Sequence, residues 1–175
     1  EFTLLDFNAT TVARARDGLS EAIAQSGREV APEVHEFSVQ QMLAHGTRLL
    51  NQPKLARSGL LERGGYDLLY CAGLFDYLSD RVCERVLRVF WELAAPGAAI
   101  IASNFAPPNP MRAFMDYVLD WRLLHRPESL VRTLAVEDSL KPRSRTIPAP
   151  GGVEIFLRMD KPWSVQEFDA VPPGE

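Results

Sequence analysis

The residues near the start of the chain that could bind a ligand are an acid and its two neighbours. Asp6 closes the short apolar run 2–5, and a helical pattern begins directly after Asn8. A carboxylate at the end of a strand can accept hydrogen bonds from two adjacent sugar hydroxyls at once. The alternative is that it stabilises the following helix, because the N-terminal end of a helix dipole favours negative charge. Phe7 and Asn8 would share this site, although Phe7 could instead pack in the core.

A second group of candidate binding residues follows an apolar segment in the middle of the chain. Residues 66–73 form a near-continuous apolar run, which is typical of a strand that is buried on both faces of a parallel sheet. Cys71, Ala72 and Gly73 would close this strand, at the edge where open α/β sheets bind their ligands. Gly73 would allow close approach of a ligand or would supply a turn with an unusual backbone angle. Further candidates for ligand contact follow directly: Phe75, Asp76 and Tyr77. Burial of the two rings is the alternative.

Other polar residues fall at the ends of expected elements. Ser38 and Val39 close an extended segment, and Ser38 could bind a ligand or cap a helical turn over 40–44. Asn104 and Phe105 end a later strand, and the proline-rich residues after them would form a stiff loop that could frame a pocket. The next helical segment carries polar or aromatic side chains that could face a substrate: Arg112, Tyr117, Trp121 and His125. Arg112 could pair with a carboxylate, whereas His125 near a helix end is more often a solvated charge.

Length and composition limit the class of protein. The 175 residues are 46% hydrophobic and can bury one core, so we expect one domain over residues 1–162 and a loose tail over 163–175. No apolar stretch is long enough to span a bilayer and no signal peptide is evident, which predicts a cytoplasmic protein. The net charge of −4, with basic Arg122, Arg126 and Arg132 sparsely placed, argues against a nucleic-acid partner. Cys71 and Cys83 lack metal-ligand spacing and are expected to be buried thiols.

The elements that would position these residues follow from hydrophobic periodicity and turn residues. In the first half we expect a helix that Thr10 or Thr11 caps and Gly27 ends, with an inward face of Val12, Ala15, Leu19, Ala22 and Ile23, and then a strand over 34–39. Residues 46–65 would form a long connection.

In the second half, a helix capped by Ser79 would present Val82, Val86, Val89, Phe90 and Leu93 inward and end at Pro96-Gly97. A buried strand over 98–103 would follow in a right-handed parallel crossover. A helix over 110–124 would place Met111, Met115, Val118 and Leu119 in the core. Two strands, over 146–148 and 153–159, would meet at Gly151-Gly152 in an antiparallel pair.

Taken together, this order of elements resembles the class I S-adenosylmethionine-dependent methyltransferases from their second strand onward, over residues 2–161. Residues 70–80, 109–112 and 115–121 are more specifically similar to bacterial methyltransferase-like proteins linked to 3-hydroxypalmitic acid methyl ester, a quorum-sensing signal. The family's Gly-x-Gly-x-Gly motif is absent, so the chain is expected to be either the later part of a cofactor-binding domain, with a strand and a glycine loop upstream in the parent protein, or a domain that has lost that part of its site. The resemblance implies a Rossmann-like, doubly wound, mostly parallel sheet with an antiparallel C-terminal edge strand, lacking the first strand-helix unit.

The resemblance also implies S-adenosylmethionine as cofactor and assigns roles to the candidates. Those implied for the cofactor are Asp6, Phe7 and Asn8 at the ribose, Ser38 and Val39 at the adenine, and Cys71, Ala72, Gly73 and Phe75 towards the methionine. Those implied for a small-molecule or fatty-acid substrate are Asn104, Arg112, Tyr117 and Trp121. If the acceptor is a hydroxyl or an amine that needs a base, Asp76 and Tyr77 are the catalytic candidates, and Asp120 is a further one. A fatty carboxylate acceptor is already ionised and needs none.

Other functions stay open at this point. A non-catalytic binding or scaffold module could keep the same fold without the glycine loop. An NAD-type reductase would also have an acid at the end of its second strand, the position that Asp6 takes here. The Pro-Gly stop and the terminal hairpin match the methyltransferases better. The sequence does not decide the oligomeric state, and a homodimer is compatible with it.

Overall fold

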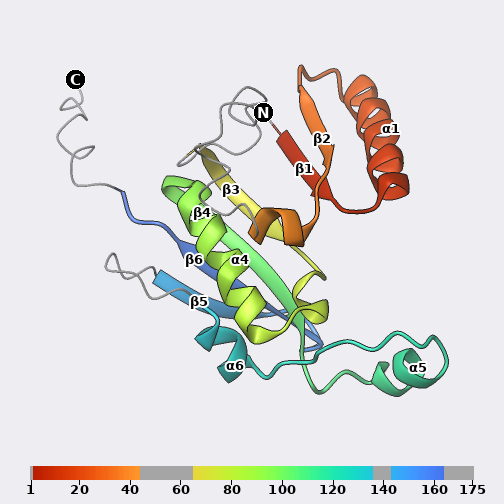
Figure 1. The fold of residues 1–175 in the computed structure, drawn as a ribbon, viewed down its shortest axis with the longest axis vertical. Coiled ribbons are helices and arrows are strands. Elements are labelled where there is room, and N and C mark those ends of the chain that lie inside the picture. Colours follow the sequence, from red (N-terminus) through yellow and green to blue (C-terminus); the bar gives the residue numbers. More distant parts are fainter. Residues whose placement is uncertain (1, 44–64, 136–142, 164–175) are drawn as a thin grey trace. The chain divides into compact units, whose positions relative to one another are not determined.

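The computed structural model describes residues 2–43, 65–135 and 143–163, and the chain forms two compact units, Glu1–Leu60 and Leu61–Glu175 (Figure 1). Each unit is considered by itself. The single domain over residues 1–162 stays a prediction. The connection over residues 46–65, apart from Gly65, and the tail after Trp163 lie outside the described residues.

The first unit is a strand-helix-strand motif. Strands β1 (Phe2–Asp6) and β2 (Pro32–Glu36) pair in parallel, and helix α1 (Ala9–Ser26) connects them. Gly27 ends α1 in the left-handed conformation, with φ of 63°, as its position in the sequence predicted. Strand β2 begins and ends earlier than the expected 34–39.

The N-terminal cap of α1 was predicted wrongly. The Asn8 side chain, rather than Thr10 or Thr11, accepts hydrogen bonds from the backbone N–H groups of those two threonines, at 2.9 and 3.2 Å. Asparagine is as good a cap as threonine or better, and its position before the first helical residue leaves both donors in reach. On the expected inward face, Val12 is buried, Ala15, Leu19 and Ile23 are half-buried, and Ala22 is exposed.

The second unit is built on a mixed sheet with the strand order β3-β4-β6-β5. Strands β3 (Tyr66–Cys71) and β4 (Ala94–Phe105) are parallel, and helix α4 (Asp80–Leu93) crosses between them over one face of the sheet (Figure 1). Strands β6 (Glu154–Asp160) and β5 (Arg143–Pro148) are antiparallel to their neighbours. The α/β class, the parallel crossover and the antiparallel C-terminal strands are therefore confirmed.

Strand β3 is covered less completely than its apolar sequence suggested. Leu69 and Cys71 are buried, but Leu68 and Tyr70 are 58% and 61% exposed. Alternate side chains of a strand point to opposite faces, so one face of β3 is packed and the other is open. The prediction of a strand buried on both faces is wrong for this unit.

Helix α4 supplies most of the core above the sheet. Its buried residues are Cys83, Val86, Leu87, Phe90, Trp91 and Leu93, while Val82 and Val89 are only half-buried. The helix ends at Leu93 rather than at Pro96-Gly97, because β4 already begins at Ala94. The Lys161 ammonium donates to the backbone carbonyls of Trp91 and Ala94, at 2.8 and 2.7 Å, and so satisfies the C-terminal end of the helix.

The segment after β4 departs most from the expected helix over 110–124. Helix α5 spans only Arg112–Tyr117, and the short helix α6 (Glu128–Thr133) was not predicted. Asp120 adopts a positive φ of 47°, and the Trp121 N–H donates to the Met115 carbonyl at 2.8 Å, which closes α5. Met115 is buried, but Met111, Val118 and Leu119 are exposed, so three of the four expected core positions are wrong.

Candidate functional site

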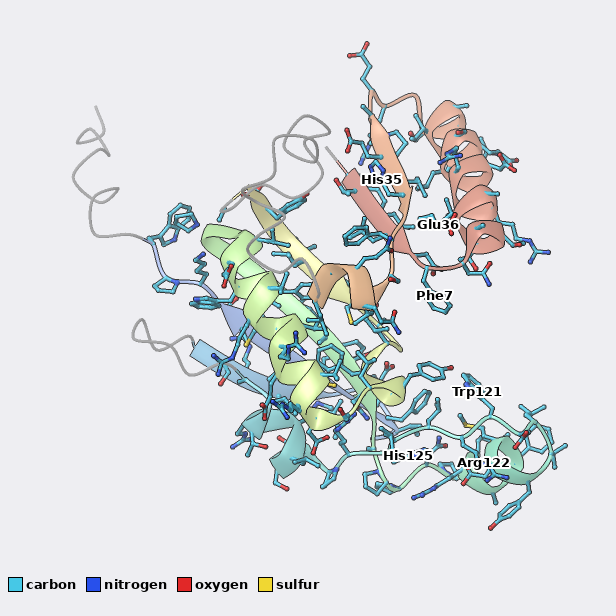
Figure 2. The ribbon with its side chains drawn as sticks, in the orientation of Figure 1. Phe7, His35, Glu36, Trp121, Arg122 and His125 are labelled. Atoms are coloured by element: carbon cyan, nitrogen blue, oxygen red, sulfur yellow. The ribbon has the colours of Figure 1, made fainter. Side chains whose placement is uncertain are left out.

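In the first unit, the candidate acid lies at the carboxyl end of a parallel strand pair. Asp6 ends β1 and stands in register with Glu36 at the end of β2. The Asp6 carboxylate accepts a hydrogen bond from the Asn8 N–H at 2.7 Å, so it also orders the start of α1. Phe7 is 67% exposed, which rules out the core position considered for it, and Figure 2 shows it at this end of the unit with His35 and Glu36.

Sequence reasoning missed Glu36 and His35. Their signal was their place at the end of the neighbouring strand, but the predicted strand ran to residue 39 and so did not end at Glu36. Glu33 pairs with His35 across 3.3 Å. The role of Asp6, Phe7 and Asn8 in binding a ribose stays a prediction.

Ser38 has the capping role that was weighed for it. Its hydroxyl accepts from the Gln41 N–H at 3.1 Å, and its own N–H donates to the Gln41 side chain at 2.8 Å. This reciprocal capping box begins the helical residues 39–43. A contact of Ser38 and Val39 with an adenine stays a prediction.

In the second unit, the carboxyl ends of β3 and β4 lie side by side. Gly73 has a φ of 73°, which confirms the unusual backbone angle, and its N–H donates to the Ser103 hydroxyl at 3.2 Å. A Cβ atom on Gly73 would meet no atom within 4 Å, so a ligand has room to approach this backbone. Cys71 and Ala72 precede it, the first buried and the second exposed. Burial raises the pKa of the Cys71 thiol to about 12, so it stays neutral and is a poor nucleophile.

Asp76 is a buried carboxyl beside this edge. It is 1% exposed, its Oδ1 accepts from the Phe105 N–H at 2.7 Å, and its Oδ2 has no hydrogen-bond partner in the described structure. Burial raises the pKa of Asp76, the hydrogen bond from Phe105 opposes that rise, and Glu154 adds to it. His125 and Arg126 act in the lowering direction more weakly. A carboxyl of this kind can hold a proton or take one up, as a general base must.

The other two members of the loop differ in exposure. Phe75 is 1% exposed, so its ring packs in the core, as the alternative interpretation proposed. Tyr77 is exposed, and its hydroxyl accepts a hydrogen bond from the Trp121 Nε1–H at 2.6 Å. The structure thus brings together two predicted site residues that lie 44 positions apart in the chain.

Arg126 organises this loop and was missed as a site residue. It is 2% exposed, and its guanidinium donates to the Asp80 carboxylate at 2.8 Å and to the Phe75 carbonyl at 2.8 Å. It also donates to the Leu78 carbonyl and to the Asn104 side-chain oxygen. The five N–H donors of the guanidinium fork allow one side chain to reach these four acceptors. In the sequence Arg126 had looked like one member of a sparse basic cluster.

The predicted substrate-binding residues separate into a buried and an exposed set. Both amide hydrogens of the buried Asn104 are used within the protein, in bonds of 2.9 Å to the Phe105 and Leu124 carbonyls. Arg112 is half-exposed and lies 3.5 Å from Asp116, and Tyr117 is 88% exposed. Their contacts with a substrate stay predictions.

His125 is not the solvated helix-end charge that was favoured. It lies outside any helix and is half-buried, and its ring lies 6.0 Å from that of Phe105. Its Nε2 lies 3.4 Å from the Asn109 side-chain nitrogen, and its Nδ1 lies 3.1 Å from the Leu123 carbonyl. Figure 2 shows it on the segment that carries Trp121 and Arg122.

The described residues contain no cluster of three or more histidine, cysteine, aspartate or glutamate side chains suited to a metal ion. Within the same ranges, no helix has the length and apolar character that crossing a membrane requires.

Comparison with known proteins shows what this arrangement of strands is similar to. No protein-family model matches the chain, and no curated protein matches it. Solved structures do. Magnesium protoporphyrin IX methyltransferase from Synechocystis PCC 6803, with bound S-adenosylhomocysteine, matches 91% of this chain and 63% of its own, at a TM-score of 0.58 and 14% identity.

Two further solved structures match this chain equally broadly. The pyocyanin biosynthetic protein PhzM matches 91% of this chain and 42% of its own, at a TM-score of 0.56 and 19% identity. The S-adenosylmethionine-dependent methyltransferase SibL also matches 91% of this chain, and 43% of its own, at a TM-score of 0.56 and 16% identity. The chain has the Rossmann-like fold of these proteins, two of which are methyltransferases by name. It spans about half the length of the solved structures that it matches.

Proposed function

We propose that this chain is part of an S-adenosylmethionine-dependent methyltransferase and that its acceptor is the carboxylate of a hydroxy fatty acid. The proposal of a methyltransferase rests on the strand order of the second unit. Strands β3 and β4 run parallel, and β6 lies between β4 and β5 and is antiparallel to both. Solved methyltransferases share this fold over nearly all of the chain, and one of them holds the demethylated cofactor.

The residues at the strand ends fit such a cofactor chemically. The open space at Gly73 suits an extended ligand that passes over the backbone, and the exposed Phe7 offers an aromatic face. In this proposal the Asp6 carboxylate accepts from the two ribose hydroxyls, and Ser38 with Val39 borders the adenine. Cys71, Ala72, Gly73 and the Phe75 backbone border the methionine. When bound, the cofactor supplies an electrophilic methyl group on a sulfonium.

The acceptor half rests on chemistry and on the sequence resemblance to proteins linked to 3-hydroxypalmitic acid methyl ester. Methyl transfer is an in-line displacement, so the protein contributes mainly alignment and a site that excludes water. A carboxylate is ionised at neutral pH and attacks without a general base. Arg112 could hold such a carboxylate, and the apolar Tyr117 and Trp121 suit an acyl chain. If the acceptor is a hydroxyl instead, Asp76 or Tyr77 is the base.

A non-catalytic binding or scaffold module is the alternative, because a Gly-x-Gly-x-Gly loop is absent from this sequence. Calorimetric titration of S-adenosylmethionine separates the two functions. The titration uses the 175-residue chain and the same chain with any residues that precede it in its gene restored. Binding by either protein supports the enzyme. Binding by neither overturns the proposal, and binding of NADH in its place would indicate a reductase.

Matched variants and an acceptor assay make the test specific. Asp6→Asn keeps the oxygen that accepts from Asn8 but removes the charge, so affinity should fall by about ten-fold or more. Asp17→Asn, on the exposed side of α1, should bind like the unaltered chain. Transfer of a labelled methyl group to 3-hydroxypalmitate tests the acceptor. Cofactor binding without methylation of such acids would overturn the acceptor alone.

A further inference from the structure

The β3–α4 loop and the α5–α6 linker of the second unit are joined to each other at the end of β4. The loop comprises residues 72–79 and the linker residues 118–127. Both backbone groups of Phe105, the last residue of β4, bond to these two segments. Its N–H donates to the Asp76 Oδ1 at 2.7 Å, and its carbonyl accepts from the Arg126 N–H at 2.9 Å. The end of β4 therefore holds the loop and the linker together.

Asp76 also bonds to the linker directly. Its backbone carbonyl accepts from the Leu124 N–H at 2.8 Å, and the hydroxyl of the next residue, Tyr77, accepts from the Trp121 indole N–H at 2.6 Å. Adjacent residues share a rigid peptide plane, so the bonds that fix Asp76 also fix the backbone of Tyr77. The Asp76 side chain is therefore one of the groups that decide where Tyr77 lies against Trp121.

Exposure separates the two loop residues that were considered as a base. Asp76 is 1% exposed and its Oδ2 has no hydrogen-bond partner in the described structure, whereas Tyr77 is 58% exposed. A general base must come within about 3 Å of the proton that it removes. The Tyr77 hydroxyl can do so at the surface, but the Asp76 carboxyl would first have to leave Phe105. Burial also raises the pKa of Asp76, which favours a neutral carboxyl, and a neutral carboxyl can still accept from the Phe105 N–H.

We propose that Asp76 is a positioning residue, which sets Tyr77 against Trp121 and so aligns the cofactor with the acceptor without touching either. This inference rests on the proposed methyltransferase function, which gives the methionine of the cofactor to the β3–α4 loop and the acyl chain to Trp121 of the linker. In an in-line displacement, a misplacement of about 1 Å can cost about 100-fold in rate. Asp76 then serves transfer to a carboxylate that needs no base, and Tyr77 is the base if the acceptor is a hydroxyl.

The amide variant Asp76→Asn separates positioning from proton transfer. It keeps an oxygen that accepts from the Phe105 N–H but cannot act as a base, whereas Asp76→Ala has no side-chain acceptor. The assay is transfer of a labelled methyl group to 3-hydroxypalmitate. Asp76→Asn should keep kcat within about three-fold, whereas Asp76→Ala should lower it about 100-fold with little change in the KM for S-adenosylmethionine. Asp67→Ala removes an exposed carboxylate of β3 and is the matched control that should leave kcat unchanged.

A second measurement does not depend on catalysis. The chain has three tryptophans, and the Trp121 indole N–H signal in a nitrogen-15 NMR spectrum is assigned by its loss in Trp121→Phe. Tyr77→Phe removes the acceptor of this N–H and gives the shift that loss of the bond causes. Asp76→Ala should shift the signal in the same direction, and Asp76→Asn and Asp67→Ala should not. Asp76→Glu keeps a carboxyl on a longer side chain, so it should also shift the signal, and it replaces Asp76→Ala if that variant does not fold.

The outcomes distinguish this inference from the proposed function. A rate that survives Asp76→Asn but falls in the variants that shift the Trp121 signal supports the inference. Loss of transfer in Asp76→Asn with the Trp121 signal in place overturns it, because Asp76 would then act on the reactants directly. Folded Asp76→Ala and Asp76→Glu chains with an unshifted signal also overturn it. Absence of methyl transfer from the unaltered chain counts against the proposed function instead, and the Trp121 signal still decides whether Asp76 positions Tyr77.

Discussion

Replacement of Arg126 by methionine should destabilise the second unit severely. Methionine keeps much of the apolar stem but removes every donor, which leaves the Phe75 and Leu78 carbonyls and the Asn104 side-chain oxygen without their partner. A buried acceptor that loses its donor costs about 1–3 kcal/mol, and breaking a buried charged network costs about 3–5 kcal/mol. Asp80 is half-exposed and adds little, because water replaces the lost partner. We therefore expect a loss of about 3–5 kcal/mol in the free energy of unfolding.

Urea unfolding followed by tryptophan fluorescence measures this loss. The three tryptophans, at positions 91, 121 and 163, all belong to the second unit, so the signal reports on the unit that holds Arg126. Arg126→Lys should be intermediate, because an ammonium cannot reach all the acceptors of a guanidinium fork. If Arg126→Met does not fold, the lysine variant still yields a number.

Arg122→Met is the matched control. Arg122 lies four residues away on the same segment and also pairs with an aspartate, but both side chains are about four-fifths exposed or more. Its loss should stay below about 0.5 kcal/mol. Equal effects of Arg122→Met and Arg126→Met, both under about 1 kcal/mol, would refute the assignment of Arg126 as the residue that holds the loop.

Two further predictions concern a glycine and the buried carboxyl. Gly73→Ala should destabilise the second unit by about 1 kcal/mol, because alanine disfavours a φ of 73°. Gly18→Ala in α1 should instead stabilise its helix by roughly 0.5–1 kcal/mol. Neither added Cβ would meet an atom within 4 Å, so equal effects of the two substitutions on thermal unfolding would contradict the conformational explanation. Asp76→Asn keeps an oxygen for the Phe105 N–H and cannot ionise. Because the pKa of folded Asp76 is raised, its stabilising contribution is complete below the unfolded pKa of about 3.9 and is lost as pH rises through the folded value. The stability of Asp76→Asn relative to the unaltered chain should therefore increase between pH 4 and pH 7, and a difference that is independent of pH would show that Asp76 does not titrate in this way.

Local signals in the sequence were sufficient for the main elements. The acid-ended strand, the glycine that ends α1, the parallel crossover and the Gly151-Gly152 hairpin all depend on residues close together in the chain. Turn residues and hydrophobic periodicity act through backbone angles and the spacing of side chains, so they can be read without knowing the fold. The same kind of signal predicted the burial of both cysteines and offered capping as one of two roles for Ser38.

Local signals failed in the segment after Pro110. The apolar residues after Pro110 looked like a core helix, but of the four expected core residues there only Met115 is buried, and Asp120 ends the helix early. The sequence could not show this, because the turn depends on a left-handed aspartate, a conformation that usually selects glycine. The exposure of Val118 and Leu119 follows directly from that early end.

The sequence by itself therefore determined the α/β order of elements and the position of polar residues at the strand ends, because those features follow from short-range periodicity. Only the tertiary structure decided that Asp76 is buried against Phe105 and that Arg126 joins Phe75, Leu78, Asp80 and Asn104. Arg126 lies 51 positions from Phe75 in the chain. A buried guanidinium is tolerated only when partners from several segments converge on it, and such convergence is a property of the fold rather than of any stretch of sequence.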